Sequence, residues 1–341
     1  TAAIVAAAFF VTAAPVTAQD ADALARQVTI TRTEYGVPHI VAENYRALGF
    51  GFAYAQAEDH LHNIIRLIIE ARGEKAQHFG PGRNGGNIES DFKSRQYRYL
   101  ARATETYDQL GPDWRAMTEG FAAGLNYYIA KHRGELEDWI QPVSRYDVAA
   151  HGLAGVGRFA FDRGGIVRKF VAAMESGEST SEESEDLGSN LWAFDGTRTK
   201  SGKAILMGNP HQPWSTVATY YEAHLVIPGK LNFYGSTFIG RPVLTTGFNE
   251  HLGWTHTVNY PDLEEIYALD LDPQRRDHYL LDGKSHPMTY SDETVAVEEN
   301  YEVATPVIVP LSNSDVPDVG SIQSGVPGGT WENILRRKET R

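Results

Sequence analysis

Hydrophobic side chains recur at helical spacing in the first half of the chain. Between residues 45 and 79, apolar positions three or four residues apart indicate helices that end at the turn sequence Gly80-Pro81-Gly82. Before them, residues 27–34 alternate between apolar and polar side chains as a strand does. The N-terminal half is therefore predicted to be mainly helical, with one helix pair over residues 45–79, a second pair over 101–133 and a weaker helix over 146–161.

The pattern changes from residue 189 onward to short runs bounded by Gly, Pro, Asn and Asp. Runs of this kind at hairpin-like intervals predict β-strands. Strands need helices or another sheet to cover their faces, and the predicted helices all lie upstream. The sequence thus predicts an α+β fold with strands over residues 191–196, 203–208, 218–227, 231–235, 243–248, 252–258, 264–270 and 278–281.

An acidic segment separates the two halves. Residues 175–186 contain six acidic side chains and no apolar one, so this stretch cannot bury apolar surface and is expected to be a solvated spacer. The predicted organisation is a signal peptide over residues 1–18, a helical segment over 19–174, a spacer over 175–188 and a strand-rich segment over 189–341.

The start of the chain resembles an export signal. Residues 1–14 are an apolar run of Ala, Ile, Val and Phe, and small residues typical of a cleavage site follow up to Ala18. The run is too short for a membrane span and lacks an initiator Met, so the true beginning is expected to lie upstream. We expect a periplasmic or secreted bacterial protein without membrane insertion of the mature chain.

Composition excludes several classes of partner and chemistry. A formal net charge of −13 without a run of Lys and Arg argues against binding to nucleic acid or to an anionic membrane surface. The chain has no cysteine, which excludes a disulfide framework, a thiol nucleophile and a thiolate metal site. The balance of 42% hydrophobic and 22% charged residues is that of an ordinary globular protein.

The candidate chemistry lies at the junction between spacer and strands. A hydroxyl residue directly after a glycine, as in Gly188-Ser189, can attack the preceding carbonyl, because glycine offers no side chain to obstruct the strained geometry. Cleavage there would free an α-amine that titrates at about pH 8 and can accept the proton of the same residue's hydroxyl. The alternative is a plain turn between two domains, since Gly-Ser-Asn is common in loops.

Three separated motifs add to this interpretation. The segments Ser189-Asn190-Leu191-Trp192, residues 208–214 and residues 253–258 resemble the start of the catalytic subunit of the penicillin acylase family, in particular its acyl-homoserine-lactone and aculeacin acylase branch. The likeness runs from about Val28 to about Gly283. It implies a four-layer αββα N-terminal-nucleophile hydrolase fold, self-cleavage between Gly188 and Ser189, a processed heterodimer of the two segments, and hydrolysis of a linear amide without a catalytic cofactor.

The resemblance also assigns roles to individual residues. Ser189 corresponds to the nucleophile and base, the backbone N–H of Val258 to an oxyanion donor, and His211 to a residue that supports the serine amine or the oxyanion. A second oxyanion donor of the family, an asparagine, would lie beyond residue 341. The chain is therefore expected to be part of a longer protein and to lack most of the activity when alone.

Substrate and metal contacts are expected at further positions. Gln212 stands where the acyl-homoserine-lactone branch usually has an aromatic residue, which favours a more polar acyl pocket. The substrate is expected to be a small acylated amine, and the sequence does not choose among acyl-homoserine lactones, β-lactam antibiotics and lipopeptides. Some penicillin acylases hold a structural calcium, for which Asp262, Glu264 and Glu265 offer oxygen ligands, although a solvated acidic loop is the favoured interpretation. The other candidate pocket residues are Trp214, Phe159 and Phe161.

Two competing functions remain open. Ser90-Asp91-Phe92-Lys93 matches the S-x-x-K motif of serine β-lactamases, and Lys200-Ser201-Gly202 resembles their K-T-G element, but no Ser-Asp-Asn lies between them. That interpretation predicts acylation at Ser90 and an uncut chain. A non-catalytic periplasmic binding protein would instead bind its ligand without turnover or self-cleavage.

Overall fold

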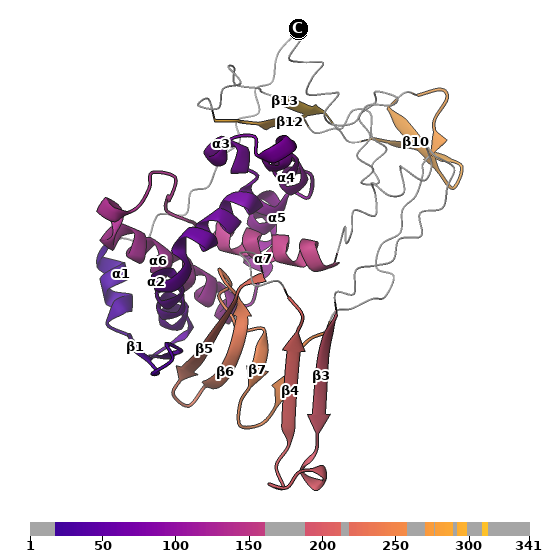
Figure 1. The fold of residues 1–341 in the computed structure, drawn as a ribbon. Helices are drawn as coiled ribbons and strands as arrows, with labels where there is room; N and C mark the ends of the chain where they lie inside the picture. Colours follow the sequence, from indigo (N-terminus) through magenta and orange to yellow (C-terminus); the bar gives the residue numbers. More distant parts are fainter. Residues whose placement is uncertain are drawn as a thin grey trace.

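The computed structural model describes residues 18–160, 188–212, 218–257, 270–275, 277–288, 292–298 and 309–312. Its helices lie in the first half of the chain and its larger sheets are built mostly from the second half (Figure 1). The α-helices are α1 (Ala18–Ala25), α2 (Tyr45–Arg72), α3 (Lys75–Phe79), α4 (Gly86–Gln96), α5 (Tyr99–Thr106), α6 (Pro112–Lys131) and α7 (Arg145–Ala160). None of these described helices combines the length and apolar character needed to cross a membrane.

The strands form one larger sheet and three small ones. The six-stranded sheet has the order β1-β2-β5-β6-β7-β8, and β3 with β4 forms a separate antiparallel hairpin. Smaller sheets join β9, β10 and β11, and β12 with β13. The strands are β1 (Val28–Arg32), β2 (Pro38–Ala42), β3 (Ser189–Phe194), β4 (Ile205–Pro210), β5 (Tyr220–Ile227), β6 (Leu231–Phe238), β7 (Thr246–Phe248), β8 (Gly253–Trp254), β9 (Asp270–Leu271), β10 (His278–Leu281), β11 (Lys284–Pro287), β12 (Asp292–Val295) and β13 (Val309–Ser312).

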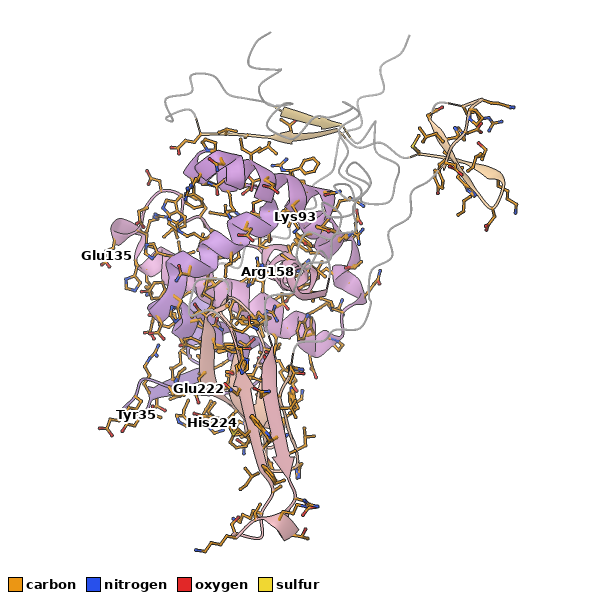
Figure 2. The ribbon with its side chains drawn as sticks, turned by 45° about the vertical axis from the view of Figure 1, so that its right-hand side comes forward. Tyr35, Lys93, Glu135, Arg158, Glu222 and His224 are labelled. Atoms are coloured by element: carbon orange, nitrogen blue, oxygen red, sulfur yellow. The ribbon has the colours of Figure 1, made fainter. Side chains whose placement is uncertain are left out.

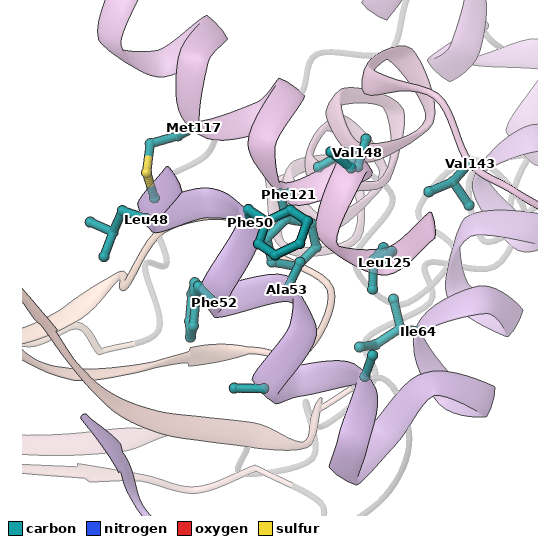
Figure 3. Close-up of a cluster of buried hydrophobic side chains, with 14 of the residues drawn as sticks. Leu48, Phe50, Phe52, Ala53, Ile64, Met117, Phe121, Leu125, Val143 and Val148 are labelled. Carbon is teal, nitrogen blue, oxygen red and sulfur yellow. The ribbon is translucent and has the colours of Figure 1, made fainter. Parts of the chain in front are cut away.

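Helix α2 forms the centre of the core. It begins at Asn44, whose side chain accepts a hydrogen bond from the Ala47 N–H, and it ends at Gly73 in the left-handed conformation with φ 72°. Its apolar residues pack against α6 in a buried cluster (Figure 3) that includes Phe52 and Phe121, both without exposed surface. The backbone is non-helical at His60, so the predicted helix pair over residues 45–79 consists of one long irregular helix and the short α3.

Alternation along β5 and β6 gives the large sheet two different faces. Tyr221, Ala223 and Leu225 point into the cluster around α2, whereas their neighbours Glu222 and His224 lie on the opposite, outer face. The helical layer therefore covers only one face of the sheet. The outer face is left for the hairpin and for the candidate site.

The parallel pair β2 and β5 joins the two halves of the chain. His39 lies opposite His224 in this pairing, and their Nδ1 atoms are 2.8 Å apart, so one ring donates a hydrogen bond to the other. The Tyr221 hydroxyl donates to the Ala55 carbonyl of α2 at 2.8 Å, and the Arg32 guanidinium donates to the same oxygen at 3.1 Å. Strands distant in sequence are thus fixed to one helix.

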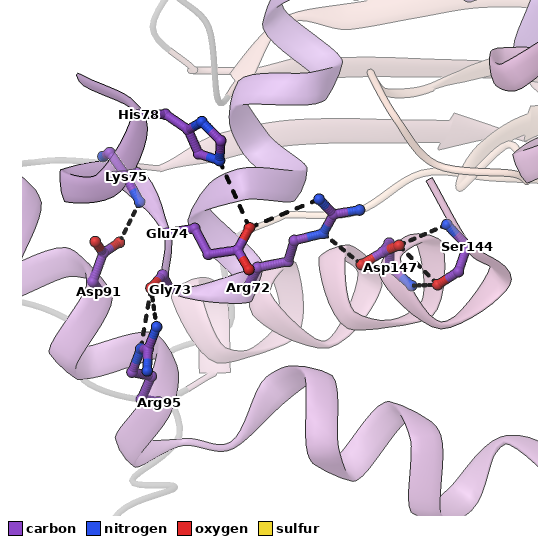
Figure 4. Close-up of polar contacts among 9 residues, drawn as sticks. All are labelled: Arg72, Gly73, Glu74, Lys75, His78, Asp91, Arg95, Ser144 and Asp147. Atoms are coloured by element: carbon purple, nitrogen blue, oxygen red, sulfur yellow. Dashed lines mark hydrogen bonds and ion pairs between the residues drawn. The ribbon is translucent and has the colours of Figure 1, made fainter. Parts of the chain in front are cut away.

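Helix α4 was not predicted, because its face contains few apolar residues and its stability depends on tertiary contacts. The Asp91 carboxylate accepts hydrogen bonds from the backbone N–H groups of Lys75 and Ala76 at 2.7 Å, and so holds the start of α3. Burial raises the pKa of Asp91 to about 6 despite these bonds. Nearby, Arg72 pairs with the Asp147 carboxylate at 2.6 Å and links α2 to α7 (Figure 4).

The observed architecture confirms the predicted α+β class. One helical layer, the six-stranded sheet and the first hairpin of a further sheet correspond to part of the expected four-layer αββα arrangement. Boundaries differ by a few residues: the strand expected over 191–196 is β3, which lies two residues earlier, and the strand expected over 203–208 is β4, which lies two residues later. Most of the strand expected over 264–270 lies outside the described residues.

Candidate active site

Ser189 is the first residue of β3, and its position follows from the hairpin register. Ser189 lies opposite Pro210, the last residue of β4, so His211 and Gln212 lie just beyond the end of the pair and next to the serine. A proline at this point ends the strand because it has no N–H to continue the ladder. The hairpin thus brings together residues that are about twenty positions apart in the sequence.

The hydroxyl of Ser189 is held by two backbone groups. It donates a hydrogen bond to the Gly188 carbonyl oxygen at 2.8 Å and accepts one from the His211 N–H at 3.3 Å. The side chain is half-buried. The hydroxyl therefore lies beside the carbonyl of the Gly188-Ser189 bond, with a backbone donor on its other side.

The imidazole of His211 is oriented by the neighbouring strand residue. The Asn209 amide lies 3.2 Å from His211 Nε2, which in this arrangement accepts its hydrogen bond and leaves the proton on Nδ1. A Cβ placed on Gly188 would lie 4.0 Å from that Nδ1. The Nδ1 nitrogen of His211 therefore lies near Gly188.

An open cavity of about 1770 Å³ extends from Ser189 between the hairpin and the outer face of the large sheet. Its walls include Ser189, Pro210 and Gln212 from the hairpin and Thr255, His256 and Thr257 after β8. The hairpin approaches β8 closely, because a Cβ on Gly208 would lie 2.4 Å from the Thr255 hydroxyl oxygen. The cavity is large enough for a drug-sized substrate.

The structure brings some of the predicted site residues together. Ser189, His211 and Gln212 lie at one end of the hairpin, and Gln212 lines the cavity. Phe159 is on α7, but its side chain lies outside the described part of the structure. Six other predicted site residues also lie outside the described residues: Val258, Trp214, Phe161, Asp262, Glu264 and Glu265.

Several cavity residues were not singled out from the sequence. The outer face of the sheet contributes Tyr220, Glu222, Tyr234 and Phe238, and Arg241 follows at the end of β6. Figure 2 shows Glu222 on this sheet. The alternation of buried and exposed positions along β5 and β6 was a usable signal for the outward residues, whereas nothing local marks Arg241.

Electrostatic coupling is clearest between Tyr234 and Glu222. The Tyr234 hydroxyl donates a hydrogen bond to the Glu222 carboxylate, and this bond, together with burial, raises the pKa of the tyrosine to about 12. The pKa of Tyr220 is also raised, mainly by burial. Both phenols stay protonated at neutral pH and can donate hydrogen bonds within the cavity.

The residues of the competing β-lactamase interpretation lie elsewhere. Ser90 and Lys93 are inside helix α4, and neither lines the cavity next to Ser189. Among the described residues, no group of three or more histidine and carboxylate side chains is arranged to hold a metal ion.

The chain resembles known acylases over most of its length. It is 36% identical over 304 residues to the acyl-homoserine lactone acylase PvdQ of Pseudomonas fluorescens strain Pf0-1, covering 82% of this chain and 39% of that protein. It is 28% identical over 300 residues to the aculeacin-A acylase of Actinoplanes utahensis, covering 78% of this chain and 38% of the relative. The chain thus spans less than half the length of these relatives.

A solved structure of the thermostable penicillin G acylase from Alcaligenes faecalis also matches. The TM-score is 0.38 and the identity 22%, over 46% of this chain and 95% of that chain. Residues 27–310 match the penicillin amidase family. Together with the identity to PvdQ, this match means that the chain belongs to the penicillin amidase family.

Proposed function

We propose that this chain provides the N-terminal part of an amidohydrolase that cleaves linear amides through Ser189 after the chain has cut itself between Gly188 and Ser189. The observation that carries the proposal is the position of Ser189 at the start of β3, at the edge of a large cavity, with its hydroxyl beside the Gly188 carbonyl. Membership of the penicillin amidase family and the acylases among the relatives support it.

Self-cleavage would use the serine hydroxyl alone. Ser189 Oγ attacks the Gly188 carbonyl carbon, the peptide C–N bond breaks, and its nitrogen takes a proton to become the free α-amine. Water then hydrolyses the resulting ester and regenerates the hydroxyl. The His211 backbone N–H, which is bonded to the Ser189 hydroxyl, and the imidazole near Gly188 would steady the reacting groups.

The same serine would then act on substrate. The new α-amine accepts the hydroxyl proton, Oγ attacks the amide carbonyl, and the amine product leaves with a proton while an acyl-enzyme forms. Water hydrolyses the acyl-enzyme and releases a carboxylic acid. By analogy with the relatives, the Val258 N–H and an asparagine from the rest of a longer protein would hold the oxyanion.

The relatives and the cavity support a proposal for the substrate. The relatives include acylases of acyl-homoserine lactones and of aculeacin A, and Gln212 on the cavity wall favours a partly polar acyl group over a fully apolar one. We further propose export to the periplasm or beyond, a processed heterodimer of the two segments, and catalysis without a cofactor.

The test compares wild-type and Ser189→Ala protein in a chain continued to the length of the relatives. Intact mass and N-terminal sequencing should show a cut that exposes Ser189 in the wild type only. Hydrolysis of an acyl-homoserine lactone, a β-lactam amide and a lipopeptide should follow the cut and fall by at least about a thousandfold in Ser189→Ala.

Ser201→Ala is the matched control, because Ser201 lies in the turn of the same hairpin. It should leave both cleavage and hydrolysis unchanged. An uncut wild-type protein that hydrolyses none of the three amides would refute the proposal and favour the binding-protein interpretation.

A further inference from the structure

Arg241 lines the same cavity as Ser189, and its backbone is bonded to the core. It follows Gly240, which has φ 79°, and precedes Pro242. The buried Gln56 amide of α2 accepts a hydrogen bond from the Gly240 N–H at 2.8 Å and donates one to the Arg241 carbonyl at 3.1 Å. The turn that carries Arg241 is therefore anchored to the core, and changes in its side chain leave both of these bonds intact.

The guanidinium has a defined position between α7 and the cavity. It lies 5.2 Å from the centre of the Phe238 ring, and its Nη2 would be 2.2 Å from a Cβ placed on Gly155. Only a glycine at position 155 leaves room for it there. Arg241 nevertheless lines the cavity that begins at Ser189.

In the part of the chain that the structure describes, no acidic group compensates the charge of Arg241. Its Nε is buried without a hydrogen-bond partner, and among the described residues no carboxylate lies within ion-pair distance of the guanidinium. Glu222, the acidic residue on the neighbouring strand, accepts a hydrogen bond from Tyr234 instead. Burial, and secondly the charge of Arg158, lower the pKa of Arg241.

Arg158, whose charge acts on Arg241, differs from it in this respect. It pairs with the Glu70 carboxylate at 2.7 Å (Figure 2 labels its position on α7). A buried charge without a partner is costly, and a guanidinium matches a carboxylate in bidentate geometry. An anionic ligand would therefore supply the partner that the guanidinium of Arg241 lacks.

We propose that Arg241 binds a carboxylate of the substrate, so that the preferred amides carry a negative charge as well as the scissile bond. The inference rests on the proposed function, since the cavity it concerns begins at the proposed nucleophile. The carboxylate belongs either to the acyl chain or to the amine portion of the substrate, and in each case it contacts the guanidinium of Arg241.

The test uses the chain continued to the length of the relatives and three related amides. These are an octanoyl-homoserine lactone, its ring-opened form with a carboxylate on the amine side, and a lactone whose acyl chain ends in a carboxylate. Arg241→Gln should lower kcat/KM for one of the two carboxylate substrates by about 30-fold or more and leave the neutral lactone within about threefold. The substrate that loses rate identifies the side on which the carboxylate binds.

Three further variants separate charge from structure. Arg241→Lys should retain part of the preference, because it keeps the charge but not the planar pair of donors. Gly155→Ala should lower the preference while leaving Arg241 in place, since the new methyl group displaces the guanidinium. Lys200→Gln, which removes one positive charge at the exposed turn of the hairpin, should change nothing.

A binding measurement separates the two proposals. Calorimetry compares the affinity of uncut Ser189→Ala protein for the ring-opened and acid-terminated amides with and without Arg241→Gln. Arg241-dependent binding to the Ser189→Ala protein, together with a wild-type protein that hydrolyses none of the amides, would support this inference and refute the proposed function. If Arg241→Gln lowers kcat/KM equally for charged and neutral substrates, or changes it for neither, the inference is refuted and the proposed function stands.

Discussion

At the scale of single residues, His151 is a buried histidine that reports on the acid stability of the fold. It lies on α7 with 4% of its surface exposed, and its Nε2–H donates a hydrogen bond to the Ile239 carbonyl at 3.1 Å. Burial lowers its pKa from 6.5 to about 4, and the nearby charges of Arg241 and Arg158 act in the same direction, whereas Glu70 opposes them. The folded state therefore keeps this ring neutral.

We expect His151 to destabilise the protein in mild acid. The unfolded chain binds a proton at His151 below pH 6.5, whereas the folded chain does so only near pH 4. The contribution of the neutral ring to the free energy of unfolding is therefore complete above pH 6.5 and is lost as the pH falls toward about 4. The expected loss between about pH 7.5 and about pH 5 is roughly 2 kcal/mol of unfolding free energy. Urea denaturation at the two pH values measures it.

His151→Gln provides the comparison, because a glutamine amide can donate to the same carbonyl but does not titrate. The difference in stability between the two pH values should shrink by about the same roughly 2 kcal/mol in this variant. An identical pH dependence in both proteins would show that His151 is not the responsible group. Glu70 and Asp147, whose pKa values are lowered, contribute equally to both proteins.

At the scale of elements, the contact between α2 and α6 depends on glycines that allow the two backbones to approach. A Cβ on Gly124 would lie 2.2 Å from the Phe50 carbonyl oxygen, and one on Gly120 would lie 1.9 Å from that of Arg46. Backbone atoms of packed helices cannot move away as a flexible side chain can. The close crossing is what lets Phe52 and Phe121 meet in the core.

Gly124→Ala should therefore destabilise the fold by about 1–3 kcal/mol, because the added methyl group forces the helices apart. Gly152→Ala is the matched control in a helix, since its Cβ meets no atom within 4 Å. That change should be neutral or stabilising by up to about 1 kcal/mol. Denaturant midpoints of the two variants should move in opposite directions, and equal shifts would contradict the role of the crossing.

At the scale of the whole molecule, the hairpin β3 and β4 is apolar on both faces. The face on the cavity side carries Leu191, Ala193 and Leu206. The other face carries Trp192 and Met207, which lie opposite each other and have 42% and 51% exposed surface. Strands with apolar residues on both faces are typical of sheets covered on both sides. In Figure 1 the hairpin extends farther from the helices than β5 to β7.

This exposed face should bind a hydrophobic dye. The double variant Trp192→Thr with Met207→Thr should lower the fluorescence of bound anilinonaphthalene sulfonate in the 341-residue chain, because it removes the centre of a contiguous apolar patch. Tyr35→Thr is the control, since Tyr35 is an isolated aromatic residue with 90% exposed surface (Figure 2). Dye binding that falls equally in both variants would contradict the prediction.

Whether an element could be predicted from the sequence depends on how far along the chain its stabilising interactions reach. The helices over residues 45–72, 112–131 and 145–160 and the strands from Ser189 onward were predictable, because apolar periodicity and turn residues act within one element. Helix α4 was not, since Asp91 stabilises that region through contacts about fifteen residues away. The irregular backbone at His60 had no local signal either.

For the candidate site, the sequence by itself determined the Gly188-Ser189 pair and the motif that carries His211 and Gln212, because these residues lie within short recognisable stretches. Only the tertiary structure decided what surrounds them. The hairpin register places His211 beside the serine, and the pairing of β2 with β5 joins segments 185 residues apart. Arg241 packs against Gly155 with its buried Nε unpartnered only in the folded chain. Burial and ion pairing depend on distant neighbours, and such neighbours are brought together only when the chain folds.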